Sequence, residues 1–109
     1  MIETASLTIT ETQLSEIESA LEEMLTGSKA TSVLLINSID GSLISSKGLT
    51  EELDTTSLAA LAAGTFASAR EIARLVGEPE FTVLFHQGKR QHVPVNQAGE
   101  HGLLMTLFT

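Results

Sequence analysis

The segment Asp54 to Val76, DTTSLAALAAGTFASAREIARLV, repeats apolar residues at three- and four-residue steps, which predicts an α-helix. Beyond Asp54, charge appears only at Arg70, Glu71 and Arg74, so small apolar residues also cover much of the other side. A helix that is apolar on both sides is buried on both sides. We therefore expect another protein to cover it, with a further layer of the same domain as the alternative. The stripe expected to face the chain's own sheet is Leu58, Leu61, Ala62, Thr65, Ala69, Ile72, Ala73 and Val76.

Length and composition predict one domain over residues 1–109, with residues 1–9 as a flexible N-terminal segment. The chain has no cysteine, which excludes disulfides and thiolate metal sites and fits a cytoplasmic location. No run approaches the roughly 20 apolar residues of a membrane-spanning helix, so we expect no membrane insertion. Fourteen acidic residues against six basic ones give a net charge of −8, which argues against nucleic-acid binding.

The apolar patterns predict an α+β fold in the order helix, two strands, helix and three strands. Asp40-Gly41 is a strong turn signal between the first two strands, and the second of these, 42–46, is expected to lie at an edge. The last strand, 101–108, is apolar on both faces and should be central.

A hairpin is predicted around the turn Gly88-Lys89-Arg90. If Gln87 pairs with Gln91, then His86 lies opposite His92. Two opposed histidines are half of a metal site, but no carboxylate or cysteine is clearly placed beside them, so we predict surface imidazoles and no metal. Proline removes a ladder donor, so a bulge or register change is expected at residues 93–95. The face under the long helix is predicted to hold Phe81, Val83, Phe85, Val93 and Val95.

The element order, the Asp40-Gly41 turn and the alanine- and glycine-rich second helix resemble the roadblock / dynein light chain family. Three stretches, HQGKR at 86–90, AGEHGLL at 98–104 and LVGE at 75–78, are similar to its bacterial MglB branch. Members of that branch are homodimeric partners of the Ras-like GTPase MglA. The resemblance covers residues 11–108 and implies a roadblock-type α-β-β-α-β-β-β fold, with a five-stranded antiparallel sheet and helices on both faces.

The resemblance also implies a homodimer, formed through the second helix and the third strand, that joins two sheets into one of ten strands. The paired helices of such a dimer form the platform that receives an MglA-like GTPase. Residues expected at or near this platform are Ala60, Gly64, Ala67 and Glu71. Residues expected at the dimer interface are Ala59, Ala63, Phe66, Arg70, Phe81, Val83 and Phe85. The sequence leaves open which stripe serves which partner.

The function implied by the resemblance is activation of the GTPase, without cofactors or catalytic residues of the chain's own. MglB-like proteins are expected to favour the active conformation of the GTPase rather than insert an arginine. Arg70, Arg74 and Arg90 remain candidates for insertion, against a simpler role as surface charge or as a Glu71–Arg74 pair. A dimeric scaffold that binds a GTPase or another roadblock subunit without changing its rate is the alternative. No phosphate-binding loop occurs, so the chain itself should not bind GTP. Many roadblock proteins have a third helix that follows the last strand and covers the open face of the sheet. The sequence stops at Thr109, so either this segment was removed or the chain is a short variant.

Overall fold

A computed structural model of the chain describes residues 2–4 and 7–109. Its elements are β1 (Ile2–Thr4), β2 (Leu7–Ile9), α1 (Glu11–Thr26), β3 (Ala30–Asn37), β4 (Leu43–Gly48), α2 (Thr55–Val76), β5 (Val83–Gln87), β6 (His92–Ala98) and β7 (Gly102–Phe108). The five-stranded antiparallel sheet has the order β4-β3-β7-β6-β5, so β4 is an edge and β7 is central, as predicted. The predicted α-β-β-α-β-β-β order is confirmed from α1 onward.

The flexibility expected of residues 1–9 stays a prediction, and the described part of this segment contains two short strands. Residues 2–4 and 7–9 pair as the antiparallel strands β1 and β2, which form a two-stranded sheet of their own. The side chain of Ile9 is buried, which ties the end of this hairpin to the rest of the fold.

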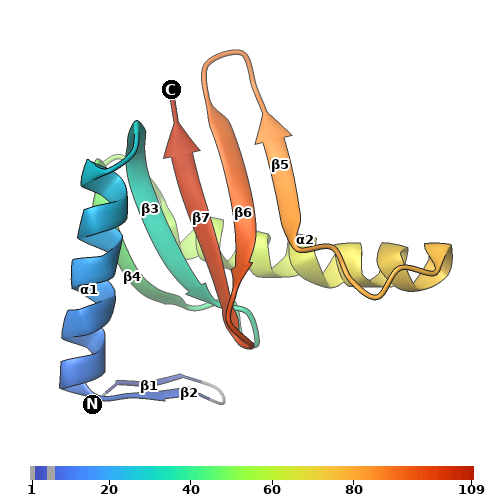
Figure 1. Ribbon diagram of the computed structural model, residues 1–109, viewed down its shortest axis with the longest axis horizontal. Coiled ribbons are helices and arrows are strands. Elements are labelled where there is room, and N and C mark those ends of the chain that lie inside the picture. Colours follow the sequence, from blue (N-terminus) through green and yellow to red (C-terminus); the bar gives the residue numbers. More distant parts are fainter. Residues whose placement is uncertain (1, 5–6) are drawn as a thin grey trace.

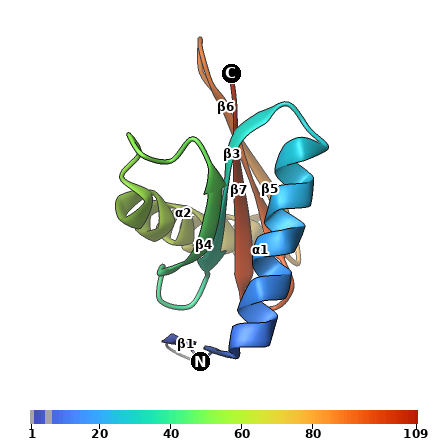
Figure 2. The same ribbon diagram turned by 90° about the vertical axis from the view of Figure 1, so that its left-hand side faces the viewer.

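The two helices cover opposite faces of the sheet (Figure 2). On one face α1 packs along β3 and β4, while on the other α2 crosses β4, β3 and β7. Because α2 runs across the strands, its C-terminal half projects beyond β5, at the edge of the sheet (Figure 1). Each helix follows a residue whose side chain caps it: Thr10 forms a capping box with Gln13 in the first turn of α1, and Asp54 caps α2.

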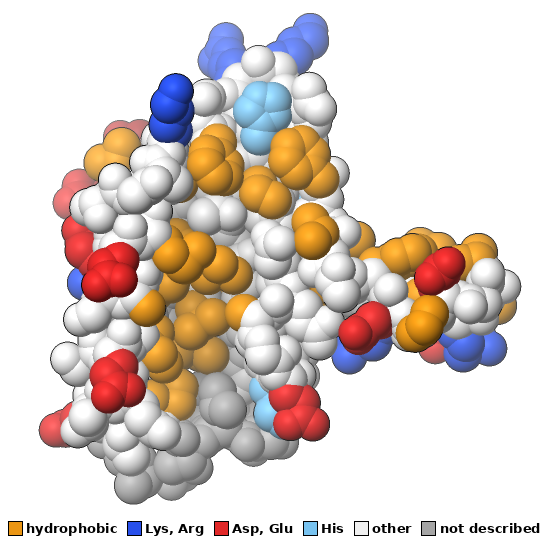
Figure 3. Space-filling model, in the orientation of Figure 1, with side chains coloured by type: hydrophobic (Ala, Val, Ile, Leu, Met, Phe, Trp, Pro, Cys, Tyr) orange, Lys and Arg blue, Asp and Glu red, His pale blue; other side chains and the backbone are white. Residues whose placement is uncertain are grey.

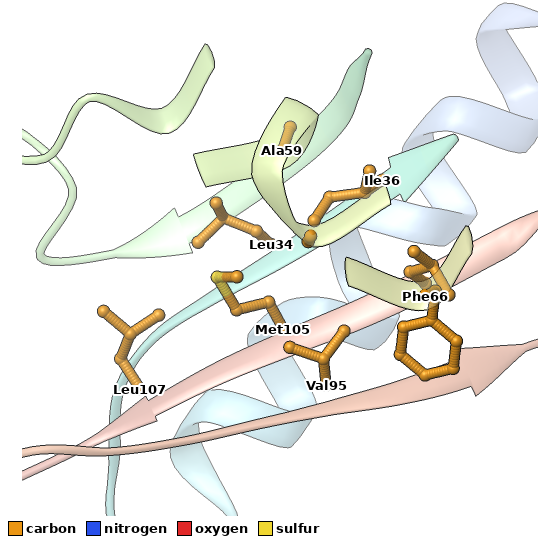
Figure 4. Close-up of a cluster of buried hydrophobic side chains, with 9 residues drawn as sticks. Leu34, Ile36, Ala59, Phe66, Val95, Met105 and Leu107 are labelled. Atoms are coloured by element: carbon orange, nitrogen blue, oxygen red, sulfur yellow. The ribbon is translucent and has the colours of Figure 1, made fainter. Parts of the chain in front are cut away.

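The main core lies between α2 and the sheet (Figure 4). The largest side chain that α2 contributes to it is Phe66, which lies beside Val95. Burying aliphatic and aromatic surface of this kind contributes about 1.5–3 kcal/mol per large side chain, so this layer fixes the position of α2 on the sheet. The buried members of the cluster are Leu34, Ile36, Ala59, Ala62, Phe66, Val95, Leu103, Met105 and Leu107.

The predicted register of the β5–β6 hairpin is wrong by one residue. Gln87 pairs with His92 rather than with Gln91, and His86 pairs with Val93, because the backbone N–H of Gly88 donates to the carbonyl of Gln91 and the loop takes four residues. A one-residue shift exchanges the two faces of a strand. His86 and His92 are therefore not opposite each other. Leu84, rather than Val83 and Phe85, packs with Val93 and Val95 under α2.

The bulge predicted at Pro94 is also wrong. The pairing of β5 with β6 runs without a shift from Val83 opposite Asn96 to Gln87 opposite His92. Toward β7 the register is the same on both sides of the proline, with Val93 and Pro94 left out of the paired residues. Proline is accommodated by losing pairs locally instead of by inserting a residue.

Candidate functional site

The rotation of α2 about its axis differs from the prediction. Its buried residues are Ala59, Ala62, Phe66, Ala69 and Ala73, whereas Leu61, Thr65, Ile72 and Val76 of the predicted inner stripe are exposed. Apolar residues encircle this helix, so periodicity alone did not select the inner side. The structure places Phe66 toward the sheet, and Ala59 and Ala62 in the same core cluster let this half of the helix backbone lie close to the strands.

The consequence is a helix whose bulkiest aliphatic residues face outward. Leu61 is 68% exposed, and Ile72, Leu75 and Val76 on the projecting half are 54%, 73% and 64% exposed. Apolar side chains are visible along that projecting end in Figure 3. Large apolar residues grouped on one exposed element indicate an interaction surface. The surplus apolar area predicted from the sequence is therefore present on α2, although at other residues than expected.

Three of the four residues predicted for the GTPase platform are small and exposed, and they lie at helical spacing on one side of α2: Ala60, Gly64 and Ala67. A Cβ built on Gly64 would meet no atom within 4 Å, so this position opens directly to the surroundings. The fourth, Glu71, accepts hydrogen bonds from the guanidinium of Arg74 at 2.9 Å, and both side chains are mostly exposed. This intrahelical pair was the simpler role considered for Arg74.

The turn between β3 and β4 lies against the N-terminal half of this stripe. A Cβ on Gly41 would lie 3.1 Å from the Cα of Ala60 and 3.4 Å from the Cβ of Ala63, and its φ of +74° also favours glycine. Small side chains at positions 60 and 63 are therefore needed within the protomer, because larger ones would collide with the backbone of this turn. Ile39, on the same turn, is 45% exposed and adds an apolar side chain to this region.

The residues predicted for the dimer interface are divided by the structure. Ala59 and Phe66 belong to the protomer's own core, where the inward rotation of α2 places them, and so they offer no surface to a partner. Ala63 and Phe81 are half-buried, and Arg70 is exposed. Val83 and Phe85 are exposed on β5, the edge strand. The sequence did not single out Leu75 for any role, because the strand-facing stripe was placed on the wrong side.

The N-terminus of α2 carries the one clear electrostatic perturbation among the described residues. The hydroxyl of Ser57 donates to Oδ2 of Asp54 at 2.6 Å, and the backbone N–H of Ser57 donates to Oδ1 at 3.1 Å. These bonds to the charged form lower the pKa of the Asp54 carboxyl. Within residues 2–4 and 7–109, no group of three or more histidine or acidic side chains is arranged to hold a metal ion. No helix in the described part of the chain has the length and apolar content needed to cross a membrane.

Comparison with known proteins places these features in a family. The model of the Roadblock/LC7 domain matches residues 16–108. Among solved structures, Myxococcus xanthus MglB is 34% identical with a TM-score of 0.86, over 94% of this chain and 76% of that one. The gliding protein MglB from Thermus thermophilus is 32% identical with a TM-score of 0.87, over 97% and 80%. A structure described as MglB with a tetrameric arrangement is 31% identical with a TM-score of 0.88, over 97% and 79%. A search of curated proteins gave no match.

Proposed function

The chain belongs to the Roadblock/LC7 family, and from that membership we propose that it is a homodimeric regulator of a Ras-like small GTPase. The regulator binds the GTP form of an MglA-like GTPase and stimulates hydrolysis. The observation that carries the proposal is the exposed apolar surface of α2 beside an unpaired edge strand.

The dimer follows from two features at the same edge of the molecule. The strand β5 has a free edge, and a free edge is a template for pairing with another strand. The C-terminal half of α2 projects past that edge and carries exposed Ile72, Leu75 and Val76 (Figure 1). A two-fold related copy that pairs through β5 would lie under this projecting half and cover it. One contact would thus pair the free edge of β5 and cover the exposed apolar side chains of α2.

The platform for the GTPase is the side of α2 that carries Ala60, Gly64 and Ala67. In the proposed dimer the two helices lie side by side, and their small residues admit a partner's backbone closely. Glu71 pairs with Arg74 and adds a carboxylate at one end of the stripe.

We infer that activation works by favouring the catalytically competent conformation of the GTPase. Such a regulator supplies differential binding energy and needs no reacting group of its own. Arg74 is engaged with Glu71, and Arg90 lies in the β5–β6 turn, at the end of the sheet away from α2 (Figure 1). Arg70, which is exposed on α2, is the arginine to remove as a check on insertion.

The decisive experiment is single-turnover GTP hydrolysis by candidate Ras-like GTPases with and without this protein. We expect a faster rate with the native chain and with Arg70→Ala. If the protein binds the GTP form of the GTPase without changing the rate of GTP hydrolysis, it is a scaffold and not an activator. A loss of stimulation on Arg70→Ala, with binding intact, would replace the conformational mechanism by an inserted arginine.

The location of the platform has its own test. Gly64→Arg places a long charged side chain in the open position and should weaken binding of the GTPase by about a hundredfold, or nearly 3 kcal/mol. The helix tolerates the change, because arginine has a higher helix propensity than glycine. Ser19→Arg on the exposed side of α1 is the matched control. Unchanged affinity for the Gly64→Arg protein would place the contact elsewhere.

A further inference from the structure

Two hydrogen bonds fix the direction of the backbone groups along β5, the strand at the edge of the sheet (Figure 1). The N–H of Gln97 donates to the carbonyl of Thr82, and the N–H of Gly88 donates to the carbonyl of Gln91. In an antiparallel pair, residues that bond to the neighbouring strand alternate with residues that direct their N–H and C=O away from it. The pairing of β5 with β6 runs without a shift, so the even-numbered residues of β5 bond to β6 and the odd-numbered residues turn to the free edge.

Within the described part of the chain, three residues of β5 therefore offer unpaired backbone groups at this edge: Val83, Phe85 and Gln87. The structure supports the assignment at Phe85, which lies opposite Pro94. Proline has no N–H to donate, and a residue that directs its own groups outward requires none from it. Outward donors and acceptors at a free edge are a template for one more strand.

The template does not extend past Val83 toward α2. Leu84 packs under α2, so the alternation of a strand places Val83 and Phe85 on the opposite face. A continued strand would put Phe81 on that opposite face as well. Phe81 instead lines a small hollow together with Phe66 of α2. The regular strand thus begins after Phe81, and no fourth outward residue precedes Val83.

A second copy related by a two-fold axis can bond to this template in only a few ways. Opposite residues of an antiparallel pair lie on the same face, so the residue at the axis lies opposite its own copy. If that residue is Phe85, all three outward residues of each protomer are bonded, with Val83 opposite the partner's Gln87. If it is Leu84 or His86, one outward residue of each protomer is left without a partner. Pairing centred on Phe85 therefore leaves the fewest backbone groups unsatisfied.

We propose that β5 pairs with β5 of a second copy in the register that places Phe85 opposite the partner's Phe85. The inference rests on the proposed dimer and adds to it the alignment of the two chains. The phenyl ring of Phe85 is 60% exposed, and its centroid lies 6.1 Å from that of the His92 ring. At the axis the two phenyl rings meet and are covered, and aromatic pairs of this kind are favourable beyond the area that they bury.

Charges at the two ends of β5 favour a second copy as the occupant. Glu78 and Glu80 precede the strand, and Lys89 and Arg90 follow it in the turn to β6. All four side chains are exposed, and none of them forms an ion pair within the described residues. An antiparallel copy brings the acidic end of each strand beside the basic end of the other. The edge is therefore complementary to itself.

The chain has no cysteine, so single introduced thiols test the register directly. In the proposed register the two Cα atoms at position 85 lie about 5.5 Å apart, within the range of a disulfide. Phe85→Cys should therefore give a covalent dimer under mild oxidation, measured on non-reducing gels. The two copies of position 84, or of position 86, lie diagonally across the axis at about 7–8 Å, so Leu84→Cys and His86→Cys should cross-link at least about fivefold less. Ser19→Cys, on the exposed side of α1, is the control for chance collisions.

A second cysteine variant keeps the phenyl ring in place. Val83→Cys combined with Gln87→Cys in one chain should also cross-link, because each of these positions lies opposite the other in the partner. Each of the two single variants should not, since a position 83 or 87 lies far from its own copy. Strong cross-linking of Leu84→Cys or His86→Cys would shift the register by one residue and overturn the proposal.

Charge reversal tests the alignment without a disulfide. Lys89→Glu combined with Arg90→Glu should raise the dissociation constant of the dimer by about tenfold, because acidic ends then lie beside each other. Adding Glu78→Lys and Glu80→Lys to the same chain should restore the affinity. A reversal that has no effect, or that the second pair does not restore, would contradict an antiparallel pair of β5 strands.

The register and the proposed function fail in different ways. A protein that sedimentation shows to be dimeric, but that cross-links at position 84 or 86 or at none of the tested positions, overturns the register alone. A native chain that stays monomeric overturns the proposed dimer and the register with it.

Discussion

The helices α1 and α2 lie on opposite faces of one sheet and use apolar residues in different ways. On α1 only Leu21 is fully buried, and four glutamates in its middle and C-terminal part, at positions 16, 18, 22 and 23, keep much of its remaining surface in water. On α2 five residues are buried, and Leu61, Ile72, Leu75 and Val76 remain exposed. The acidic helix turns mainly charged side chains to the solvent, while the apolar helix carries large apolar side chains that one protomer does not cover. An exposed apolar surface such as that of α2 indicates protein partners.

The largest expected effect tests the inner side of α2. Phe66→Ala should lower the free energy of unfolding by about 3–5 kcal/mol, because it removes a buried ring and leaves a cavity beside Val95. Met24→Ala on α1 should cost less than about 1 kcal/mol, since this side chain is 40% exposed. Chemical denaturation at one protein concentration compares the two. Similar losses would contradict the assignment of Phe66 to the core.

The outer side of α2 is tested by the oligomeric state. Ile72→Glu combined with Leu75→Glu should raise the dissociation constant of the dimer by about a hundredfold, because it would bury two carboxylates without partners. The same two charges at Ser15 and Ser19 of α1 should have no effect. Analytical ultracentrifugation distinguishes the outcomes, and a double variant that stays dimeric would show that the projecting half of α2 is not in the interface.

A smaller effect separates helix stability from partner binding. Gly64→Ala should raise the free energy of unfolding by about 0.5–1 kcal/mol, since a helix interior favours alanine and nothing obstructs the added Cβ. If a GTPase backbone packs on this position, the same change should weaken its binding. Thermal denaturation and a binding titration on one sample measure both. Higher stability with unchanged affinity would mean that the partner does not approach position 64.

The smallest effect concerns the cap of α2 and its pH dependence. The pKa of Asp54 is lowered in the folded protein by the hydroxyl and the N–H of Ser57. The stabilisation is therefore present above the unfolded pKa of about 4 and is lost as the pH falls through the folded value. Asp54→Asn retains a capping side chain but removes this titration, so its stability should fall less between pH 5 and pH 2. An unchanged pH profile would show that the charge of Asp54 contributes nothing.

Sequence patterns predicted the element order, the central position of β7, the edge position of β4 and the family. These rest on local signals, such as the run at residues 101–108 that is apolar on both faces and the Asp40-Gly41 turn. The site was predicted less well. Ala60, Gly64 and Ala67 are exposed as expected, but Ala59 and Phe66 lie in the core and Leu61, Ile72 and Val76 lie outside it. A one-residue error at Gln87 likewise exchanged the faces of β5.

By itself the sequence determined that α2 has more apolar surface than a single face of a sheet covers, because that depends on composition and period alone. Only the tertiary structure decided which side faces inward. The rotation of a helix that is apolar all round is set by the fit of particular side chains, here Phe66 beside Val95 and Gly41 against Ala60, and such contacts join residues far apart in the chain.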